Sequence, residues 1–172
     1  TIIGCQLSIK REHVPPGHGQ MSAPAPAAQV VLCQDAPGYQ NLLKLVRRAF
    51  LETAATDVPQ ITWADLAGHT EGLIALTGGP AGTVGRHLLD GQKAKAEEAL
   101  ARLKGLFPGR LYLEVMRHGL PAEQRIEAAT IDLAYSHDLP LVATNEAFFA
   151  DEAMYEAHDA LICVAEKSFV SV

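Results

Sequence analysis

The sequence predicts an α/β fold in which parallel strands alternate with helices. Short apolar runs typical of buried strands are separated by longer stretches with helical spacing. The run from Leu141 to Ala143 stops at polar Thr144 and gives way to a helical pattern. That pattern places four apolar side chains on one face: Met154, Ala157, Leu161 and Val164. Strands and helices that alternate through short loops imply parallel strands with right-handed crossovers.

The chain begins with a predicted strand from Thr1 to Ile9. Gly4 has no side chain, which suits a place where another segment approaches the strand closely. Gln6 stands where a side chain could point into a cleft. The strand is therefore the first element that could contribute to a site.

Residues 10–29 are predicted to form a surface excursion rich in Pro, Gly and Ala, because its prolines cannot continue a helix or a central strand. His13 and His18 lie within it, either as a metal-binding pair or as two solvated loop histidines. A second short strand, Val30 to Cys33, follows the excursion.

The next helix is expected to begin at Asp35 or Ala36, with Pro37 in its first turn. An apolar stripe with helical spacing follows: Tyr39, Leu42, Leu43, Val46 and Phe50. Three basic residues fall mainly off that stripe: Lys44, Arg47 and Arg48. They are either a phosphate-binding group or an ordinary solvated helix face.

Thr62 is predicted to cap a short helix in a Thr-x-x-Asp pattern that ends at Asp65. Trp63 and Leu66 are expected to pack inward. A strand from Gly72 to Leu76 comes next. These features place a second helix and a third strand before the middle of the chain.

The glycine-rich stretch 77–82 has two interpretations. Its glycines could let backbone amides approach a phosphate, although no Gly-Lys-Ser/Thr follows. It could also be a plain turn that leads into the helix Gly85 to Leu89. A longer amphipathic helix, Gln92 to Phe107, is then ended by Pro108-Gly109.

The strand Leu111 to Met116 is largely apolar on both faces, as expected for a strand covered on two sides. Glu114 is thus a buried carboxylate, either an acid-base group or a hydrogen-bonded structural residue. His118 follows in the next loop and is a second acid-base candidate, and Pro121 opens a helix through Asp138.

The loop 145–149 follows the last predicted strand. Loops at the carboxyl ends of parallel strands usually carry the chemistry of α/β folds. Its residues Asn-Glu-Ala-Phe-Phe are therefore the first place to look for a functional site.

The composition limits the function classes. The 172-residue chain is long enough for one domain with a sizeable core, and its net charge of −6 argues against autonomous binding to a phosphate backbone. Its cysteines are widely spaced, which favours reduced thiols and the cytoplasm: Cys5, Cys33 and Cys163. No membrane span or secretory leader is visible. Because the chain opens at Thr1 directly into a strand, it is expected to be a piece of a longer polypeptide.

Several stretches together resemble one family. They are Ile2-Ile3-Gly4-Cys5-Gln6, Tyr39-Gln40-Asn41-Leu42, residues 71–79 (EGLIALTGG), Arg117-His118-Gly119-Leu120-Pro121, and Val142-Ala143-Thr144-Asn145 with Ala157-His158-Asp159. In this order they resemble the PHP (polymerase and histidinol phosphatase) domain at the amino end of bacterial DNA polymerase III alpha subunits. The resemblance implies part of a distorted (β/α)7 barrel, without its first strand-helix units and the His-x-His element they carry.

In metal-bearing members of that family, the barrel mouth holds ions among His, Asp, Glu and Cys ligands. The family's ligand positions fall here at Gln6, Phe50, Gly79, Glu146 and Phe148. Gln, Gly and Phe cannot supply the anionic or imidazole ligands that such ions need. We therefore expect no bound metal, no other cofactor and no catalytic residue in this chain.

The resemblance implies a structural domain of a bacterial replicative DNA polymerase, whose partners are a separate proofreading exonuclease and other replicase subunits. DNA would be bound through other domains. The alternatives are an active metal-dependent phosphoesterase or 3′-5′ exonuclease of the same superfamily, and an unrelated α/β enzyme using Glu114 or His118. A barrel without its first units also leaves a strand edge bare, so the chain is expected to self-associate.

Overall fold

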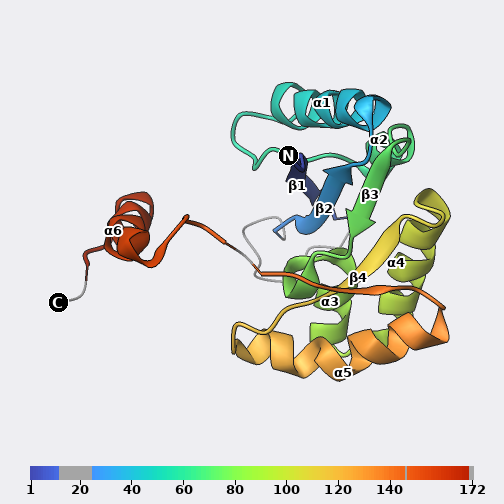
Figure 1. Ribbon diagram of the computed structural model, residues 1–172. Helices are drawn as coiled ribbons and strands as arrows, with labels where there is room; N and C mark the ends of the chain where they lie inside the picture. Colours follow the sequence, from blue (N-terminus) through green and yellow to red (C-terminus); the bar gives the residue numbers. More distant parts are fainter. Residues whose placement is uncertain (12–24, 146, 171–172) are drawn as a thin grey trace, which may run out of the picture.

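The computed structural model describes residues 1–11, 25–145 and 147–170, in which one five-stranded sheet packs against helices (Figure 1). The strands are β1 (Gly4–Ile9), β2 (Ala27–Cys33), β3 (Leu73–Leu76), β4 (Leu111–Val115) and β5 (Leu141–Ala143). The α-helices are α1 (Ala36–Leu51), α2 (Trp63–Ala67), α3 (Thr83–Leu89), α4 (Lys93–Leu106), α5 (Pro121–Ser136) and α6 (Tyr155–Glu166). Two short 3₁₀ turns are η1 (Gly79–Ala81) and η2 (Glu152–Met154). The predicted α/β class and the order of elements are confirmed.

The sheet is mixed, so the prediction of wholly parallel strands is wrong. Its order is β1-β2-β3-β4-β5, and β2 runs antiparallel to both β1 and β3. Only β3, β4 and β5 pair in parallel. The physical reason is the connection between β1 and β2: no crossover helix was predicted there, and adjacent strands without a crossover pair antiparallel. The carboxyl ends of β1, β3, β4 and β5 consequently meet the amino end of β2 at one edge of the sheet.

The second strand is longer than predicted. It begins at Ala27 rather than Val30, so residues 27–29 belong to the sheet and not to the predicted excursion at 10–29. Gln29 is fully buried in this strand and donates from Nε2 to the carbonyl of Leu76 at 2.9 Å. A buried side-chain hydrogen bond across the sheet fixes the strand although its sequence is polar at that position.

One face of the sheet carries the hydrophobic core. The buried strand residues on this face are Leu7, Ile9, Val31, Leu73, Ala75, Leu111 and Leu113. They form one cluster with Phe107 and with helix residues that include Leu45, Leu66, Leu100 and Leu103. Helices therefore cover this face from β1 to β4, whereas Leu141 and Ala143 of β5 are exposed on it.

The opposite face is covered less well. Gln6 pairs with Val30, Val30 with Leu76, Leu76 with Tyr112, and Glu114 with Val142, so these residues share a face. Val30, Tyr112 and Val142 are only partly buried and Gln6 is exposed, whereas Leu76 and Glu114 are buried. This face is well buried only toward the carboxyl edge.

Helix α1 begins where the sequence predicts, because the Asp35 carboxylate accepts a hydrogen bond from the Gly38 amide at 2.8 Å. Its buried stripe differs from the prediction and consists of Gly38, Leu42, Leu45 and Ala49. Phe50, expected to face inward, is 67% exposed. The sequence contains two apolar stripes side by side on this helix, and the predicted stripe mixed them.

The amino end of α1 lies directly against the start of β3. The carbonyl of Gly72 would be 1.8 Å from a Cβ atom on Gly38, so only a glycine allows this approach. The same carbonyl accepts a hydrogen bond from the Gln34 amide at 2.8 Å, and the Asn41 side chain donates to the Glu71 carbonyl at 3.0 Å. These contacts lock the first turn of α1 onto the sheet.

Helix α2 has the predicted capping box. The Asp65 amide donates to Thr62 Oγ1 at 3.1 Å, and the Thr62 amide donates to Asp65 Oδ2 at 2.9 Å. Asp65 also forms an ion pair with Arg48 of α1. Trp63 and Leu66 are buried as predicted. The cap therefore joins α2 to α1 as well as starting the helix.

Substituting Thr62 by alanine is expected to lower the free energy of unfolding by about 1 kcal/mol, because the Asp65 amide loses its acceptor. Urea unfolding followed by circular dichroism measures the change. Thr62→Ser keeps the hydroxyl and is the matched control. A loss as large in the serine variant as in the alanine variant would contradict the capping role.

Helix α6 is the helix that packs least against the rest of the described chain. Its predicted apolar face is present, but no residue of the helix is buried, and Leu161 and Val164 are 64% and 76% exposed. Figure 1 shows α6 standing apart from the sheet and from the other helices.

The three thiols are free, as predicted. Burial raises the pKa of Cys5, and burial together with the charge of Asp35 raises the pKa of Cys33. Both thiols are consequently protonated and poor nucleophiles at neutral pH. Within the described ranges, no helix combines the length and apolar character needed to cross a membrane.

Candidate functional site

Glu114 lies at the centre of the carboxyl edge and joins three strands. Glu114 is 5% exposed. One carboxylate oxygen accepts from the Gly78 amide at 2.9 Å, and the other accepts from Thr144 Oγ1 at 2.6 Å. The Glu114 amide in turn donates to Thr77 Oγ1 at 2.9 Å. Glu114 is therefore buried, as predicted, and its hydrogen bonds are those of a structural clamp between β3, β4 and β5.

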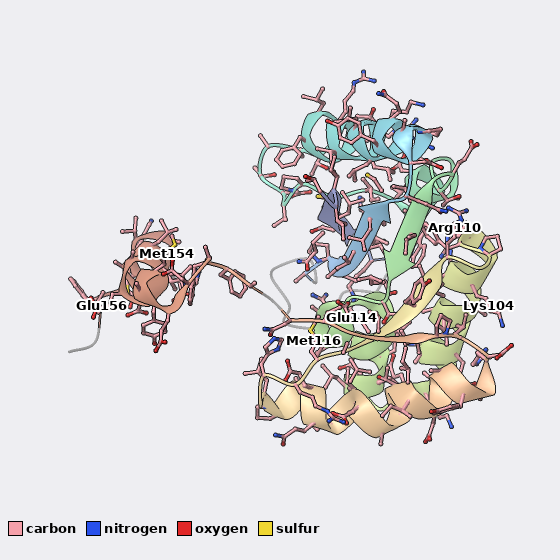
Figure 2. All side chains as sticks on the ribbon, viewed as in Figure 1. Lys104, Arg110, Glu114, Met116, Met154 and Glu156 are labelled. Carbon is pink, nitrogen blue, oxygen red and sulfur yellow. The ribbon has the colours of Figure 1, made fainter. Side chains whose placement is uncertain are left out.

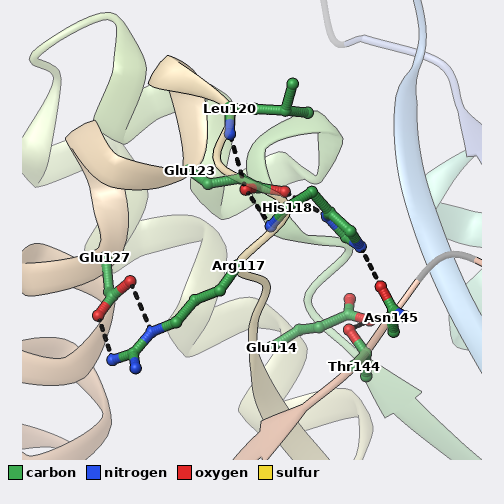
Figure 3. A network of polar contacts seen from close by, with 8 residues as sticks. All are labelled: Glu114, Arg117, His118, Leu120, Glu123, Glu127, Thr144 and Asn145. Atoms are coloured by element: carbon green, nitrogen blue, oxygen red, sulfur yellow. Dashed lines mark hydrogen bonds and ion pairs between the residues drawn. The ribbon is translucent and has the colours of Figure 1, made fainter.

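His118 forms the second part of the site, together with Glu123 (Figure 3). Glu123 Oε1 lies 2.5 Å from His118 Nδ1, and Glu123 Oε2 accepts from the backbone amides of His118 and Leu120 at 2.8 and 3.2 Å. Glu123 sits in the first turn of α5, where a carboxylate also faces the positive end of the helix. The carboxylate holds the β4–α5 loop against the helix that follows it.

The imidazole of His118 links this loop to the next one. His118 Nε2 lies 2.5 Å from Asn145 Oδ1, which belongs to the loop after β5. Both ring nitrogens thus lie within hydrogen-bonding distance of side-chain oxygens, so His118 ties the loop after β4 to the loop after β5. His118 and Asn145 were both predicted near the site, and the structure brings them together.

Glu123 was missed from the sequence because a glutamate in a first helical turn usually faces solvent. It is 4% exposed here. Burial raises the pKa of this carboxyl, but the hydrogen bonds from His118 and Leu120 and the charge of His118 outweigh burial and leave the pKa below its ordinary value. The spacing of three residues after the Leu120 N-cap, a position favoured by capping glutamates, was the available signal.

The lowered pKa of Glu123 predicts a loss of stability in acid. A carboxyl whose pKa is lower in the folded state stabilises the fold above its unfolded pKa, and this contribution disappears as the pH falls through the folded pKa. Urea midpoints measured from about pH 7 to about pH 3 should fall less steeply for Glu123→Gln than for the parent chain. Glu127→Gln is the control, and an identical pH profile in all three proteins would contradict the prediction.

Met116, the residue after β4, packs over Gly79, where the resemblance places the family's cysteine ligand. A Cβ atom there would lie 3.0 Å from Sδ and 3.1 Å from Cε of Met116, and Gly79 has a φ of +52° that disfavours side chains. Figure 2 shows Met116 beside Glu114 at this edge. The thioether occupies the space that a ligand side chain would need.

The other ligand positions do not converge. Gln6 and Phe50 are exposed, and Phe148 is 67% exposed. Phe148 stacks on His158 of α6, with the ring centroids 5.4 Å apart. Glu146 lies outside the described residues. In the described parts of the chain, no three His, Cys, Asp or Glu side chains are grouped so that they could hold a metal ion.

The weaker candidates have structural explanations where the structure describes them. Arg48 pairs with Asp65, while Lys44 and Arg47 are exposed on α1. The glycine-rich stretch forms η1 and leads into α3, as the plain-turn interpretation predicts. A Cβ atom on Gly82 would lie 1.8 Å from the Thr77 carbonyl, so its glycine serves close backbone packing. His13 and His18 fall outside the described residues.

The hollow at this edge is small. Pro80, Glu114, Met116, Glu123 and Thr130 are among its lining residues, and it has room for about one water molecule. The hydrogen bonds beside this hollow tie β3, β4 and β5 and the loops that follow them together.

Comparisons with known proteins identify relatives. The chain is 41% identical over 169 residues to the DNA polymerase III subunit alpha of Caulobacter vibrioides, which covers 98% of this chain and 14% of that protein. It is 40% identical over 136 residues to the subunit of Rickettsia bellii, which covers 79% of this chain and 12% of that protein. It is 38% identical over 134 residues to the subunit of Escherichia coli, which covers 78% of this chain and 12% of that protein. The chain thus spans about a seventh of the length of these relatives, or less.

The family comparison agrees with the resemblance noted in the sequence. The PHP domain family matches residues 1–118, which include β1 to β4 and the buried Glu114. This stretch exceeds half of the chain. The chain therefore belongs to the PHP domain family.

Proposed function

We propose that this chain is a metal-free, non-catalytic PHP domain of a bacterial DNA polymerase III alpha subunit, acting in DNA replication in the cytoplasm. The names of its relatives and their identity along most of the chain support this proposal. As a single domain, it supports the fold of the polymerase and docks the separate proofreading exonuclease. The nucleotidyl-transfer activity belongs to other parts of the parent protein.

The contact between Met116 and Gly79 carries the proposal. The Met116 side chain lies 3.0 Å from where a Cβ atom of residue 79 would stand. A thioether is a weak ligand for the hard or borderline ions that phosphoesterases use. The position that supplies a thiolate in metal-bearing relatives is here part of the packed protein.

The remaining residues do not fit a catalytic metal either. Gln6 supplies a neutral amide, and Phe50 and Phe148 supply no ligand atom at all. Hydrolysis of a phosphodiester by this family's chemistry needs a metal-activated water. Among the described residues no three His, Cys, Asp or Glu side chains are grouped to hold a metal that would generate one, so we infer that proofreading comes from another subunit.

The charge of the chain supports a docking role over a DNA-binding role. A net charge of −6 repels a phosphate backbone, so DNA is bound through other domains of the parent protein. The exonuclease and the other replicase subunits are the partners that fit a domain of this kind. No cofactor is required for either contact.

We also propose that the five strands are part of a distorted (β/α)7 barrel. The partly buried side chains of Val30, Ile74, Tyr112 and Val142 support this, because they lie on the sheet face that would become the barrel interior. Further strands would cover them and pair with the free edge of β5. Without those further strands, the unpaired edge of β5 favours self-association of the chain.

Metal analysis tests the absence of a catalytic centre. The purified chain should contain no stoichiometric zinc, manganese or iron by inductively coupled plasma mass spectrometry. It should hydrolyse neither p-nitrophenyl phosphate nor single-stranded DNA when these ions are added. Bound metal together with hydrolysis that is lost in Gln6→Ala would establish the phosphoesterase alternative instead.

Exonuclease docking is tested in the full-length parent polymerase. Surface plasmon resonance should detect binding of the exonuclease subunit to the parent protein. Deleting the region that corresponds to this chain should abolish that binding while primer extension by the remaining polymerase is assayed in parallel. Unchanged exonuclease affinity after the deletion would contradict the docking role.

A further inference from the structure

Helix α6 and the turn before it lie apart from the rest of the described chain. No residue of α6 is buried, and its main contact is with η2, the 3₁₀ turn that precedes it. Figure 2 shows Met154 and Glu156 well away from the sheet and its covering helices. A helix of 12 residues is only marginally stable alone in water. The order of α6 therefore depends on contacts made nearby in the sequence.

Asp151 fixes the point at which this segment becomes helical. Its carboxylate accepts a hydrogen bond from the Ala153 amide at 3.0 Å, and its backbone is extended, as is usual for a residue that caps the start of a helix. The Met154 amide donates to the Asp151 carbonyl at 3.2 Å, and η2 then continues directly into α6 at Tyr155. These contacts start α6 without a side chain from the sheet.

An aromatic cluster joins the residues before the turn to the first half of the helix. The His158 ring stacks on Phe148 with the ring centroids 5.4 Å apart, and it lies 5.2 Å from the ring of Phe149. Phe149 is partly buried and also meets Tyr155 edge-on, with the centroids 6.4 Å apart. Ring pairs at these separations contribute stability beyond the area that they bury. Like a hydrophobic staple, the cluster fixes the direction in which the chain enters the helix.

The end of α6 has a cap of its own. Lys167 adopts the left-handed conformation, with a φ of 54°. The Ser168 amide donates to the Cys163 carbonyl at 2.9 Å, and the Lys167 amide donates to the Val164 carbonyl at 3.5 Å. This is the hydrogen-bond pattern of a Schellman motif, which satisfies carbonyls of the last helical turn. Both ends of α6 are therefore capped by residues next to it in the sequence.

From these contacts we propose that residues 147–168 form a self-contained arm, whose helix is held by its own caps and aromatic cluster and moves as one body relative to the sheet. Among the described residues, the hydrophobic core cluster includes none from the arm. The arm and the sheet domain then unfold as separate units. The helical order of α6 depends neither on the surface that covers its apolar side chains nor on the proposed role in replication.

Amide hydrogen exchange of the 172-residue chain, measured residue by residue by NMR, tests the proposal. Amides in the second half of α6 should exchange about ten-fold or more slowly than in an unstructured peptide, and Phe149→Ala should remove this protection. The sheet domain is followed separately by urea unfolding, read from the fluorescence of Trp63, the single tryptophan, which lies in the core. Its midpoint should not change in Phe149→Ala. Unprotected α6 amides in the parent chain, or a lower Trp63 midpoint in the variant, would overturn the proposal.

Phe50→Ala is the matched control for that variant. Phe50 is 67% exposed, as is Phe148, but it lies on α1 outside the aromatic cluster, so its loss should leave the exchange of α6 unchanged. The cap provides a second pair of variants. Asp151→Ala should speed the exchange of α6, whereas Asp151→Asn keeps an acceptor oxygen and should speed it less. Unchanged exchange in both Phe149→Ala and Asp151→Ala would show that local contacts do not hold the helix, which would overturn the proposal.

Nitrogen-15 relaxation separates a moving arm from a helix that is fixed to the sheet domain. The amides of α6 should report a shorter rotational correlation time than those of α5, which packs on the sheet in the same chain. Their carbon chemical shifts should remain helical. Equal correlation times for α5 and α6 would show that the two helices tumble as one rigid body, and that result would overturn the arm.

Discussion

Alanine at position 38 should prevent the chain from folding stably. The new Cβ atom would stand 1.8 Å from the carbonyl oxygen and 2.5 Å from the carbonyl carbon of Gly72, and both are backbone atoms that cannot rotate away. Relief requires α1 to move off the start of β3, which breaks the hydrogen bond from the Gln34 amide to Gly72 and that from Asn41 to Glu71. The expected loss in the free energy of unfolding is about 3 kcal/mol or more.

Gly105 supplies the matched control for that substitution. It lies inside α4, and no atom stands within 4 Å of a Cβ built there. Gly105→Ala should therefore raise the free energy of unfolding by about 0.5 to 1 kcal/mol, since alanine loses less backbone entropy in a helix. Urea unfolding of both variants gives the comparison. If Gly38→Ala unfolds with the same midpoint as the parent chain, the close contact of α1 with β3 is wrong.

Replacing Glu114 by leucine should lower the free energy of unfolding by about 2 to 3 kcal/mol, because the buried Gly78 amide then has no acceptor. The Thr144 hydroxyl also loses its partner, although it is only partly buried and can bind water. Glu114→Gln keeps one acceptor oxygen and should lose less. Thermal and urea unfolding, each read by circular dichroism, measure the two variants.

The control for Glu114 is Glu127, whose carboxylate pairs with the exposed Arg117 side chain. Glu127→Leu should leave the urea midpoint almost unchanged, because exposed ion pairs contribute little to stability. A structural role for Glu114 also predicts that Glu114→Gln affects unfolding without affecting any hydrolytic activity. Equal stability of the Glu114 and Glu127 variants would contradict the clamp between the three strands.

The sequence predicts the local elements well where a physical signal is local. The Thr62 cap, the turn after β3 and the burial of Glu114 each follow from a few neighbouring residues. Strand direction does not follow from neighbouring residues, because it depends on the path of the chain between one strand and the next. The antiparallel β2 was therefore missed, although the absence of a predicted helix between β1 and β2 was a signal for it.

The candidate site also combines residues that the sequence predicts with residues that it does not. Its parts on β4 and in the loop after β5 were predicted, because polar residues such as Glu114 and Asn145 stand out at strand ends. The pairing of His118 with Glu123 was not, since two residues five positions apart gave no periodic signal. Phe50 was placed inward because α1 carries adjacent apolar stripes, and only tertiary packing decides which is buried.

The packing of Met116 over Gly79 also limits how this sequence can evolve. A cysteine at position 79 would adopt an unfavourable φ and require the Met116 thioether to shift by a few tenths of an ångström, while a shorter residue at position 116 would enlarge the hollow beside Glu114. The cost of a side chain at position 79 therefore depends on which residue stands at position 116, so we expect substitutions at these two positions to be non-additive.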